Sequence, residues 1–290
     1  MAKHLVFGAN GQLGREIVEQ LEAQGATVQA VGREACDVTA TASVARVFDE
    51  AEPDVVYNAA GFTLVDQAES VRSRVMRING IGAGIVAAHA RRAGARLVYF
   101  SSDYVFGDGH HAPIDETQVP DPINVYGASK LWGEQLSLQN NPETCVVRSS
   151  ALYSPYGRSV VRRMIGVAMS KKQTVTVSDD EFVAPTPTFL AAQAAIALAE
   201  QPVVGVFHAS TRGACSWFEF VRTLVERLEL EIDVQPITQE RWGAPARRPS
   251  YCALDNLMLR TLGLDRFPEW DVALDIFLER NGERIIWEVS

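Results

Sequence analysis

The sequence predicts an α/β fold with a doubly wound parallel sheet and a smaller lobe after it. Short apolar segments alternate with amphipathic segments through the first half of the chain. A glycine-rich turn, Gly8 to Gly14, follows the first apolar segment. Hydrophobic residues make up 47% and charged residues 22%, as in a globular domain. Alternating strands and helices form right-handed βαβ units whose sheet is covered on both faces.

The composition of this chain of 290 residues argues against nucleic acids and membranes as partners. A formal net charge of −9 argues against an extended nucleic-acid surface, which requires a basic stripe. The chain contains no run of about 18 apolar residues, which a membrane span would require. Its first residues do not resemble a signal peptide. The four cysteines lie far apart without a Cys-x-x-Cys pair. We therefore expect a cytoplasmic protein with no disulfide framework, no metal, no nucleic acid and no membrane partner.

The elements of the first half follow from the spacing of apolar residues. Strands are expected at residues 5–7, 27–31, 54–58, 97–100 and 144–148, and helices at 12–24, 43–51, 67–92 and 126–138. In the first helix Leu13, Ile17 and Leu21 recur at helical spacing. The third strand, Asp-Val-Val-Tyr-Asn, is apolar at its centre, as in a buried parallel strand.

After Arg148 the alternation becomes less regular. Strands are expected at 174–177 and 206–209, and helices at 160–170, 189–199 and 217–228. The last part holds Pro245, Pro249 and Pro268. We assign residues 151–290 mainly to a substrate-binding lobe that closes over the edge of the first domain, with some later segments returning to that domain.

The glycine-rich turn, Gly8-Ala9-Asn10-Gly11-Gln12-Leu13-Gly14, lies between the first strand and the first helix. There the first glycine makes a tight turn, the second lets backbone approach a pyrophosphate, and the third lets helix and strand pack closely. Unpaired N–H groups at the helix start then face the phosphates. A purely structural turn is the alternative. The position of the turn predicts that residues 1–150 form a dinucleotide-binding domain.

The end of the second strand indicates which dinucleotide binds. Arg33 stands where an acidic residue would hold the ribose 2′-OH of NADH, and a guanidinium suits the 2′-phosphate of NADPH. Glu34 follows Arg33, so NADH is a second possible cofactor. The alternative for Arg33 is a solvated surface arginine that does not contact the cofactor. We place Asp37-Val38 beside the adenine. The small side chains of Ala59-Ala60 at the end of the third strand leave room for the cofactor.

Tyr126 and Lys130 form the candidate catalytic pair, because a spacing of four places both on one face of a helix. A phenol with a pKa of about 10 is a poor acid at neutral pH, and a neighbouring ammonium lowers that pKa. Tyr126 then protonates a carbonyl oxygen while hydride reaches the carbon, and Lys130 also holds the nicotinamide ribose. Ser102, at the end of the fourth strand, aligns the carbonyl. An ordinary surface Tyr–Lys pair is the alternative.

These elements together resemble the extended short-chain dehydrogenase/reductase family, and finer features are similar to the dTDP-4-dehydrorhamnose reductases. The resemblance covers nearly the whole chain. The segments that carry it are Asn58-Ala59-Ala60, Val65-Asp66-Gln67-Ala68-Glu69, Ser102-Asp103-Tyr104-Val105-Phe106, Pro122 to Glu134, Ala184-Pro185-Thr186, Ser216 to Phe220, Arg247-Arg248-Pro249 and Leu254-Asp255.

The resemblance implies reduction of the 4-keto group of a dTDP-linked 6-deoxy-hexulose with NADPH or NADH, as in the synthesis of dTDP-L-rhamnose or related deoxysugars. It implies that Asp103 and Tyr104 position the sugar, and that Arg247 or Arg248 pairs with the substrate pyrophosphate. Ser102 replaces the family's usual threonine. The segment 157–160, Gly-Arg-Ser-Val, departs from the family's Gly-x-Asn-Phe-like pattern, which leaves the exact sugar and nucleotide open.

Two other functions are weighed against reduction. A sugar-nucleotide epimerase or dehydratase recycles NAD, against which Arg33 argues, and a dehydratase also lacks its glutamate after Ser102. A non-catalytic NADP-binding regulatory subunit does not need the intact set of Ser102, Tyr126 and Lys130. A homodimer is the assembly that general frequency favours.

We assign no function to three groups of aromatic or basic residues. We expect Trp217, Phe218 and Phe220 to pack in the core, with base stacking as the alternative. We expect the arginines at 158, 162 and 163 to form a solvated helix face, with a phosphate contact by one of them as the alternative. The pair His110-His111 is interpreted as a solvated loop, because no further metal ligands stand at fixed spacing.

Overall fold

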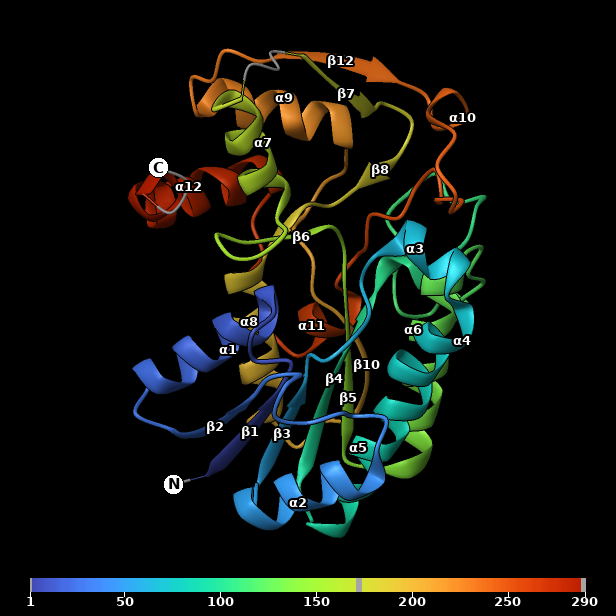
Figure 1. The fold of residues 1–290 in the computed structure, drawn as a ribbon, viewed down its shortest axis with the longest axis vertical. Coiled ribbons are helices and arrows are strands. Elements are labelled where there is room, and N and C mark those ends of the chain that lie inside the picture. Colours follow the sequence, from blue (N-terminus) through green and yellow to red (C-terminus); the bar gives the residue numbers. More distant parts are fainter. Residues whose placement is uncertain (1, 171–173, 288–290) are drawn as a thin grey trace.

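The computed structural model describes residues 2–170 and 174–287, with side chains as far as 282. Its centre is a six-stranded sheet in which all strands run parallel, in the order β10-β5-β4-β3-β1-β2 (Figure 1). The doubly wound α/β fold predicted from the sequence is confirmed. The strands are β1 (Lys3–Phe7), β2 (Thr27–Val31), β3 (Val55–Asn58), β4 (Arg96–Ser102), β5 (Thr144–Ser149) and β10 (Gly205–His208).

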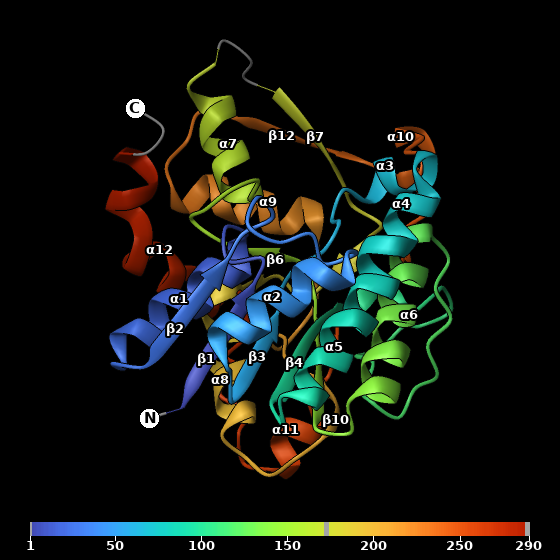
Figure 2. The ribbon, with the colours of Figure 1, turned by 60° about the horizontal axis from the view of Figure 1, so that its bottom comes forward.

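Helices cover both faces of the sheet. One face packs against α1 (Gln12–Ala23) and α8 (Thr188–Ala199), and the other against α2 (Thr41–Ala51), α5 (Gly82–Arg92) and α6 (Val125–Asn140). In Figure 2, α2 and α5 lie in front of the sheet and α8 lies behind it. Successive strand residues point to opposite faces, so Val6 joins the first core and Leu5 the second. Burial of both faces explains why these strands are apolar throughout.

The helical stretch predicted over 67–92 is present but is not one regular α-helix. This region contains α3 (Val65–Ser70), α4 (Arg72–Met76), a π-helical segment η1 (Arg77–Ile81) and then α5. Val71, with φ −123° and ψ 39°, leaves the helical conformation between α3 and α4. The widened turn in η1 carries Asn79, whose side chain bonds the backbone of Phe62 and the hydroxyl of Ser129. A 3.6-residue periodicity cannot reveal such a wide turn, and π-bulges are frequent at functional sites.

A second group of elements lies above the sheet in the view of Figure 1. It contains α7 (Val160–Ala168), β7 (Thr174–Ser178), α9 (Trp217–Arg227), β12 (Asp233–Ile237) and α12 (Trp270–Trp287). The strands β7 and β12 pair in parallel, and α9 packs on both. The shorter elements are β6 (Leu152–Tyr153), β8 (Phe182–Val183), β9 (Thr186–Pro187), β11 (Cys215–Ser216), η2 (Asp103–Val105), α10 (Gln239–Trp242) and α11 (Leu257–Thr261). The later elements β10 and α8 pack with the first domain's sheet.

The cysteines and acidic residues form no obvious covalent or metal centre in the part of the chain that the structure describes. All four cysteines are buried free thiols. Across the described ranges, no group of three or more His, Cys, Asp or Glu side chains is arranged to hold a metal ion. None of the described helices is both long enough and apolar enough to span a bilayer.

Helix α6 approaches the sheet so closely that Gly133 has no room for a side chain. An added Cβ would lie 2.1 Å from the Tyr99 hydroxyl and 2.2 Å from the Asn79 carbonyl oxygen. Both atoms are buried, so neither can move aside without disturbing β4 or η1. Only glycine allows the helix to approach at this point.

We expect Gly133→Ala to destabilise the protein by about 1–3 kcal/mol, because an overpacked core forces backbone shifts. Chemical denaturation measures this as a lower midpoint. The matched control is Gly166→Ala in α7, where an added Cβ meets no atom within 4 Å, and which should gain about 0.5–1 kcal/mol. Equal midpoints for the two variants would contradict the close approach.

Candidate active site

A cavity of about 740 Å³ opens at the carboxyl ends of β1, β2 and β3. Strand order reverses between β1 and β3, and ligands of open α/β sheets bind at such a switch point. Predicted cofactor residues that line this cavity are Gly8, Asn10, Gly11, Arg33, Asp37, Val38, Ala59 and Ala60. The predicted residues Gln12, Leu13, Gly14, Tyr126 and Lys130 do not line it.

The glycine-rich turn needs its first and last glycines for space. Gly8 has a φ of +74°, and an added Cβ would lie 2.6 Å from the Ala59 carbonyl. A Cβ on Gly14 would lie 2.2 Å from the Gly8 carbonyl oxygen. Leu13 packs in the core instead, and the Gln12 side chain accepts a hydrogen bond from the Ser154 hydroxyl at 2.9 Å. The turn is therefore shaped by the contact between β1, α1 and the end of β3.

Three basic side chains line this cavity. Arg33 is exposed there, and Arg74 and Arg77 line the same cavity. Asp37 accepts hydrogen bonds from the backbone and hydroxyl of Thr39, which lower the pKa of its carboxyl. A dinucleotide bound in this cavity would therefore meet three arginines and the ionised carboxylate of Asp37.

Helix α6 presents Tyr126 and Lys130 beside the end of β4. Its N-cap, Asn124, accepts a hydrogen bond from the Gly127 N–H at 2.7 Å, so the helix begins next to Tyr126. The Lys130 side chain is buried, and its Nζ lies 4.4 Å from the centroid of the Tyr99 ring. Such a cation–π contact compensates in part for the loss of water around the ammonium.

The charge states of the pair follow from burial. Burial lowers the pKa of Lys130 to about 8, although the Glu134 carboxylate favours its charged form. Burial and the charge of Asp103 raise the pKa of Tyr126 to about 12, while hydrogen bonding with Ser102 opposes this rise. The expected lowering of the Tyr126 pKa by Lys130 was therefore wrong. The phenol is protonated at neutral pH, which is the state that a proton donor needs.

Ser102 and Asp103 form a buried hydrogen-bonded pair at the end of β4. The Ser102 hydroxyl donates to Asp103 Oδ1 at 2.7 Å, and the Ser150 hydroxyl donates to Oδ2 at 2.7 Å. Burial raises the pKa of Asp103 to about 6. Ser102 must therefore turn its hydroxyl away from Asp103 before it can donate to a carbonyl oxygen.

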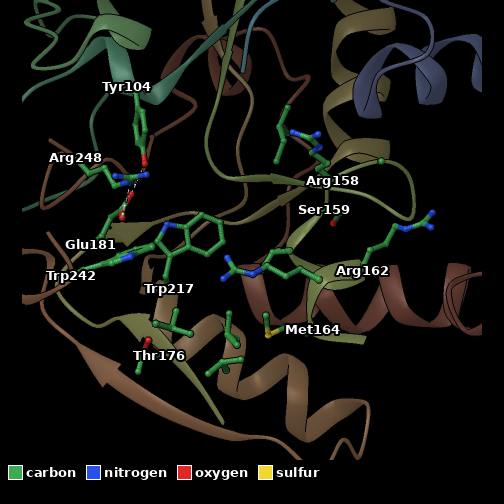
Figure 3. Close-up of a pocket in the computed structure, with 17 residues that line it drawn as sticks. Tyr104, Arg158, Ser159, Arg162, Met164, Thr176, Glu181, Trp217, Trp242 and Arg248 are labelled. Carbon is green, nitrogen blue, oxygen red and sulfur yellow. Dashed lines mark hydrogen bonds and ion pairs between the residues drawn. The ribbon is translucent and has the colours of Figure 1, made fainter. Parts of the chain in front are cut away.

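A second cavity, of about 670 Å³, lies among α7, β7, α9 and the loop that carries Arg248 (Figure 3). It reaches Tyr104, two residues after Ser102. Trp217, expected in the core, is half-buried and lines this cavity, whereas Phe220 is fully buried. The arginines at 158, 162 and 163, expected on a solvated face from which one reaches a phosphate, also line it. Three basic residues stand within six positions of the sequence, and this clustering is the signal that could have identified them as cavity residues.

Glu181 and Trp242 are cavity residues that the sequence did not indicate. The Tyr104 hydroxyl donates to Glu181 Oε1 at 2.5 Å. Figure 3 shows Tyr104 and Arg248 converging on this carboxylate. Glu181 stands far from Tyr104 in sequence and in an unremarkable acidic segment, so no local pattern could have identified it.

The two arginines predicted to bind pyrophosphate lie in different surroundings. Arg248 lines the second cavity and donates to both carboxylate oxygens of Asp66, each at 3.0 Å. Arg247 pairs with Asp108 at 2.8 Å and lines a separate cavity of about 250 Å³. The structure therefore brings only Arg248 into the same cavity as Tyr104.

Comparison with known proteins agrees with this arrangement. The RmlD substrate binding domain family matches residues 2–282. The chain is 36% identical over 279 residues to the spore coat polysaccharide biosynthesis protein SpsK of Bacillus subtilis, covering 96% of this chain and 98% of that protein. It is 37% identical over 277 residues to the dTDP-4-dehydrorhamnose reductase of Streptomyces griseus, covering 93% of this chain and 91% of that one.

A solved structure shares nearly the entire fold. The crystal structure of dTDP-4-dehydrorhamnose reductase from Bacillus anthracis in complex with NADP superposes with a TM-score of 0.93 at 34% identity. The match covers 97% of this chain and 100% of that one. With its sheet, its glycine-rich turn and its Ser-Tyr-Lys set in place, this chain belongs to the RmlD substrate binding domain family.

Proposed function

We propose that this protein reduces the 4-keto group of a dTDP-linked 6-deoxy-hexulose with NADPH, in the synthesis of dTDP-L-rhamnose or a related deoxysugar. The observation that carries the proposal is the place of the catalytic set beside two cavities. Tyr126 and Phe62, which lines the first cavity, both pack against one small apolar cluster, and the Tyr126 ring meets the ring of Tyr104 from the second cavity edge to face. A nicotinamide cofactor and a nucleotide sugar could then meet at Tyr126. Relatives bear the names of such reductases, and NADP accompanies one of them.

When bound, NADPH would supply the hydride that reaches the carbonyl carbon. The protonated phenol of Tyr126 donates its proton to the carbonyl oxygen, which becomes the product hydroxyl. This transfer is favourable because an alkoxide is a much stronger base than a phenolate. The Lys130 ammonium lies on the same helix face and stabilises the phenolate that remains. Ser102 aligns the carbonyl once its hydroxyl leaves Asp103.

We assign the sugar and pyrophosphate to the second cavity. Tyr104 lines it next to the catalytic set, and its backbone N–H donates to Asp103, which does not itself line the cavity. Of the two predicted arginines, we favour Arg248 for the pyrophosphate, because it lines this cavity and a guanidinium fork suits phosphate oxygens. Arg33 is assigned to the 2′-phosphate of NADPH, with NADH as the weaker substitute. The cytoplasmic location and the homodimer stay predictions.

We expect Tyr126→Phe to lower kcat by about 100-fold or more, because the proton donor is lost. The ring and its packing are retained, so NADPH should bind as in the unchanged protein. Consumption of NADPH with a dTDP-4-keto-6-deoxy sugar measures turnover, and quenching of tryptophan fluorescence measures cofactor binding. A variant with unchanged turnover would remove Tyr126 from the mechanism.

Arg33→Ala should raise the KM for NADPH about tenfold or more, since a charge-assisted hydrogen bond is worth roughly 1.5–3 kcal/mol. The KM for NADH should change little, because NADH carries no 2′-phosphate. Steady-state kinetics with both cofactors measures the ratio. Arg92→Ala, on α5 outside both cavities, is the control. Equal losses for both cofactors would assign Arg33 to the surface instead.

The reduction rate should fall as pH rises through about 8, where the buried Lys130 loses its charge. Because the pKa of this lysine is lowered, the ammonium is present below that pH and absent above it. Tyr126 titrates near 12 and does not contribute to this decline. Initial rates at saturating NADPH between about pH 6 and 9.5 cover this transition. A rate that stays constant across that range would show that the ammonium is not needed.

A further inference from the structure

Glu181 is a buried carboxylate for which the proposed reaction gives no role. It immediately precedes β8, and its relative exposure is 1%. Its backbone carbonyl accepts a hydrogen bond from the Trp217 N–H at 3.2 Å, which fixes the chain at this point. A carboxylate is costly to bury unless hydrogen bonds or charges compensate it. The groups around Glu181 therefore indicate what it does.

Two sides of the carboxylate face different partners. Oε1 accepts the hydrogen bond from the Tyr104 phenol, and Oε2 lies 3.9 Å from Arg248 Nε. Arg248 is itself held by Asp66 of α3. Asp103 and Cys252 also act on Glu181 through their charges, and Trp217 acts through a hydrogen bond. Burial raises the pKa of Glu181 to about 7, so the ionised form depends on these partners.

The far end of this network reaches the catalytic helix through Tyr104. The Tyr104 N–H donates to Asp103 Oδ1 at 3.0 Å and lies 3.2 Å from Ser102 Oγ, so the backbone of Tyr104 is fixed beside β4. Its carbonyl blocks any Cβ at Gly127. Its ring meets the Tyr126 ring edge to face, with centroids 6.1 Å apart and an angle of 81°. Only rotation of the Tyr104 side chain is left, and Glu181 holds its hydroxyl end.

We propose that Glu181 is a positioning residue, which holds the Tyr104 phenol so that its ring orients the proton donor Tyr126. The chain of contacts runs from Glu181 through the Tyr104 hydroxyl and ring to the Tyr126 ring. Each contact in it is direct, and an edge-to-face pair has a preferred geometry. Release of Tyr104 changes the angle at which Tyr126 meets the carbonyl oxygen. The inference rests on the proposed reductase function and adds a residue to it.

A purely structural role for Glu181 makes different predictions. If Glu181 only joined the two lobes through Arg248, its loss would lower stability and raise the KM of the sugar nucleotide. The value of kcat would then change little, and the effect would not depend on Tyr104. A positioning role instead affects kcat, leaves cofactor affinity unchanged and acts through Tyr104.

The test compares Glu181→Ala, Glu181→Gln, Tyr104→Phe and the double variant Glu181→Ala/Tyr104→Phe. We expect Glu181→Ala and Tyr104→Phe each to lower kcat about tenfold, because misplaced catalytic groups are costly. Glu181→Gln keeps an oxygen acceptor for the phenol and should recover most of the rate. Because both single changes break one contact, the double variant should be no more than about twofold slower than either. The dissociation constant of NADPH should stay the same in all four.

Glu116→Gln is the matched control. Glu116 is a half-buried glutamate that accepts backbone hydrogen bonds from His208 and Met258, and it lines neither large cavity. Its change should leave kcat unaltered. Normal kcat in Glu181→Ala, failure of glutamine to recover the rate, or multiplied losses in the double variant would each overturn the inference.

The result stays decisive in two further cases. If Glu181→Ala does not fold, Tyr104→Phe breaks the same hydrogen bond from the other side, and its normal kcat would overturn the inference. If the unchanged protein reduces no dTDP-4-keto sugar at all, the proposed function fails together with the inference. If the unchanged protein is active while the variants match it, only the inference fails.

Discussion

The close approach of helix α6 to β4 and to the π-helical segment is the constraint on which the candidate site depends. Gly127 and Gly133 leave no room for a side chain, and they bring the helix within contact of Tyr104 and Tyr99. Beneath the helix, Glu134 binds Arg148 of β5 through two hydrogen bonds, at 2.9 and 2.7 Å. A buried ion pair costs desolvation, so its main effect here is to fix how α6 sits on the sheet. This packing of α6 therefore sets the positions of Tyr126 and Lys130.

The lobes are joined by polar contacts that surround the second cavity. Arg248 binds Asp66 of α3, and Tyr104 of η2 binds Glu181, which precedes β8. The cavity wall therefore combines Tyr104, which directly follows β4, with residues of the second group of elements. Besides these charged groups, the cavity lining includes the apolar side chains of Met164, Val175 and Val221.

The sequence predicted local features well because their causes are local. The glycine-rich turn, the parallel strands and the pair Tyr126 and Lys130 each follow from spacing within a short segment. The break at Val71 and the wide turn at Asn79 were missed, because they depend on packing against α6 and on bonds to Phe62 and Ser129. Glu181 was missed because Tyr104 and Arg248, the side chains that meet its carboxylate, lie 77 and 67 residues away in sequence. The Tyr126 pKa was misjudged because burial and the charge of Asp103 raise it.

The central claim is that hydride and proton meet on one sugar carbonyl beside Tyr126. The most direct measurement uses NADPH deuterated at the transferred position, together with a dTDP-4-keto-6-deoxy-hexulose and the unmodified protein. Mass spectrometry and NMR of the sugar product then locate the label. The account predicts one deuterium on carbon 4 of the product, with the new hydroxyl proton taken from the protein and solvent. A product without deuterium at that carbon, or an unconsumed sugar with cofactor binding intact, would contradict it.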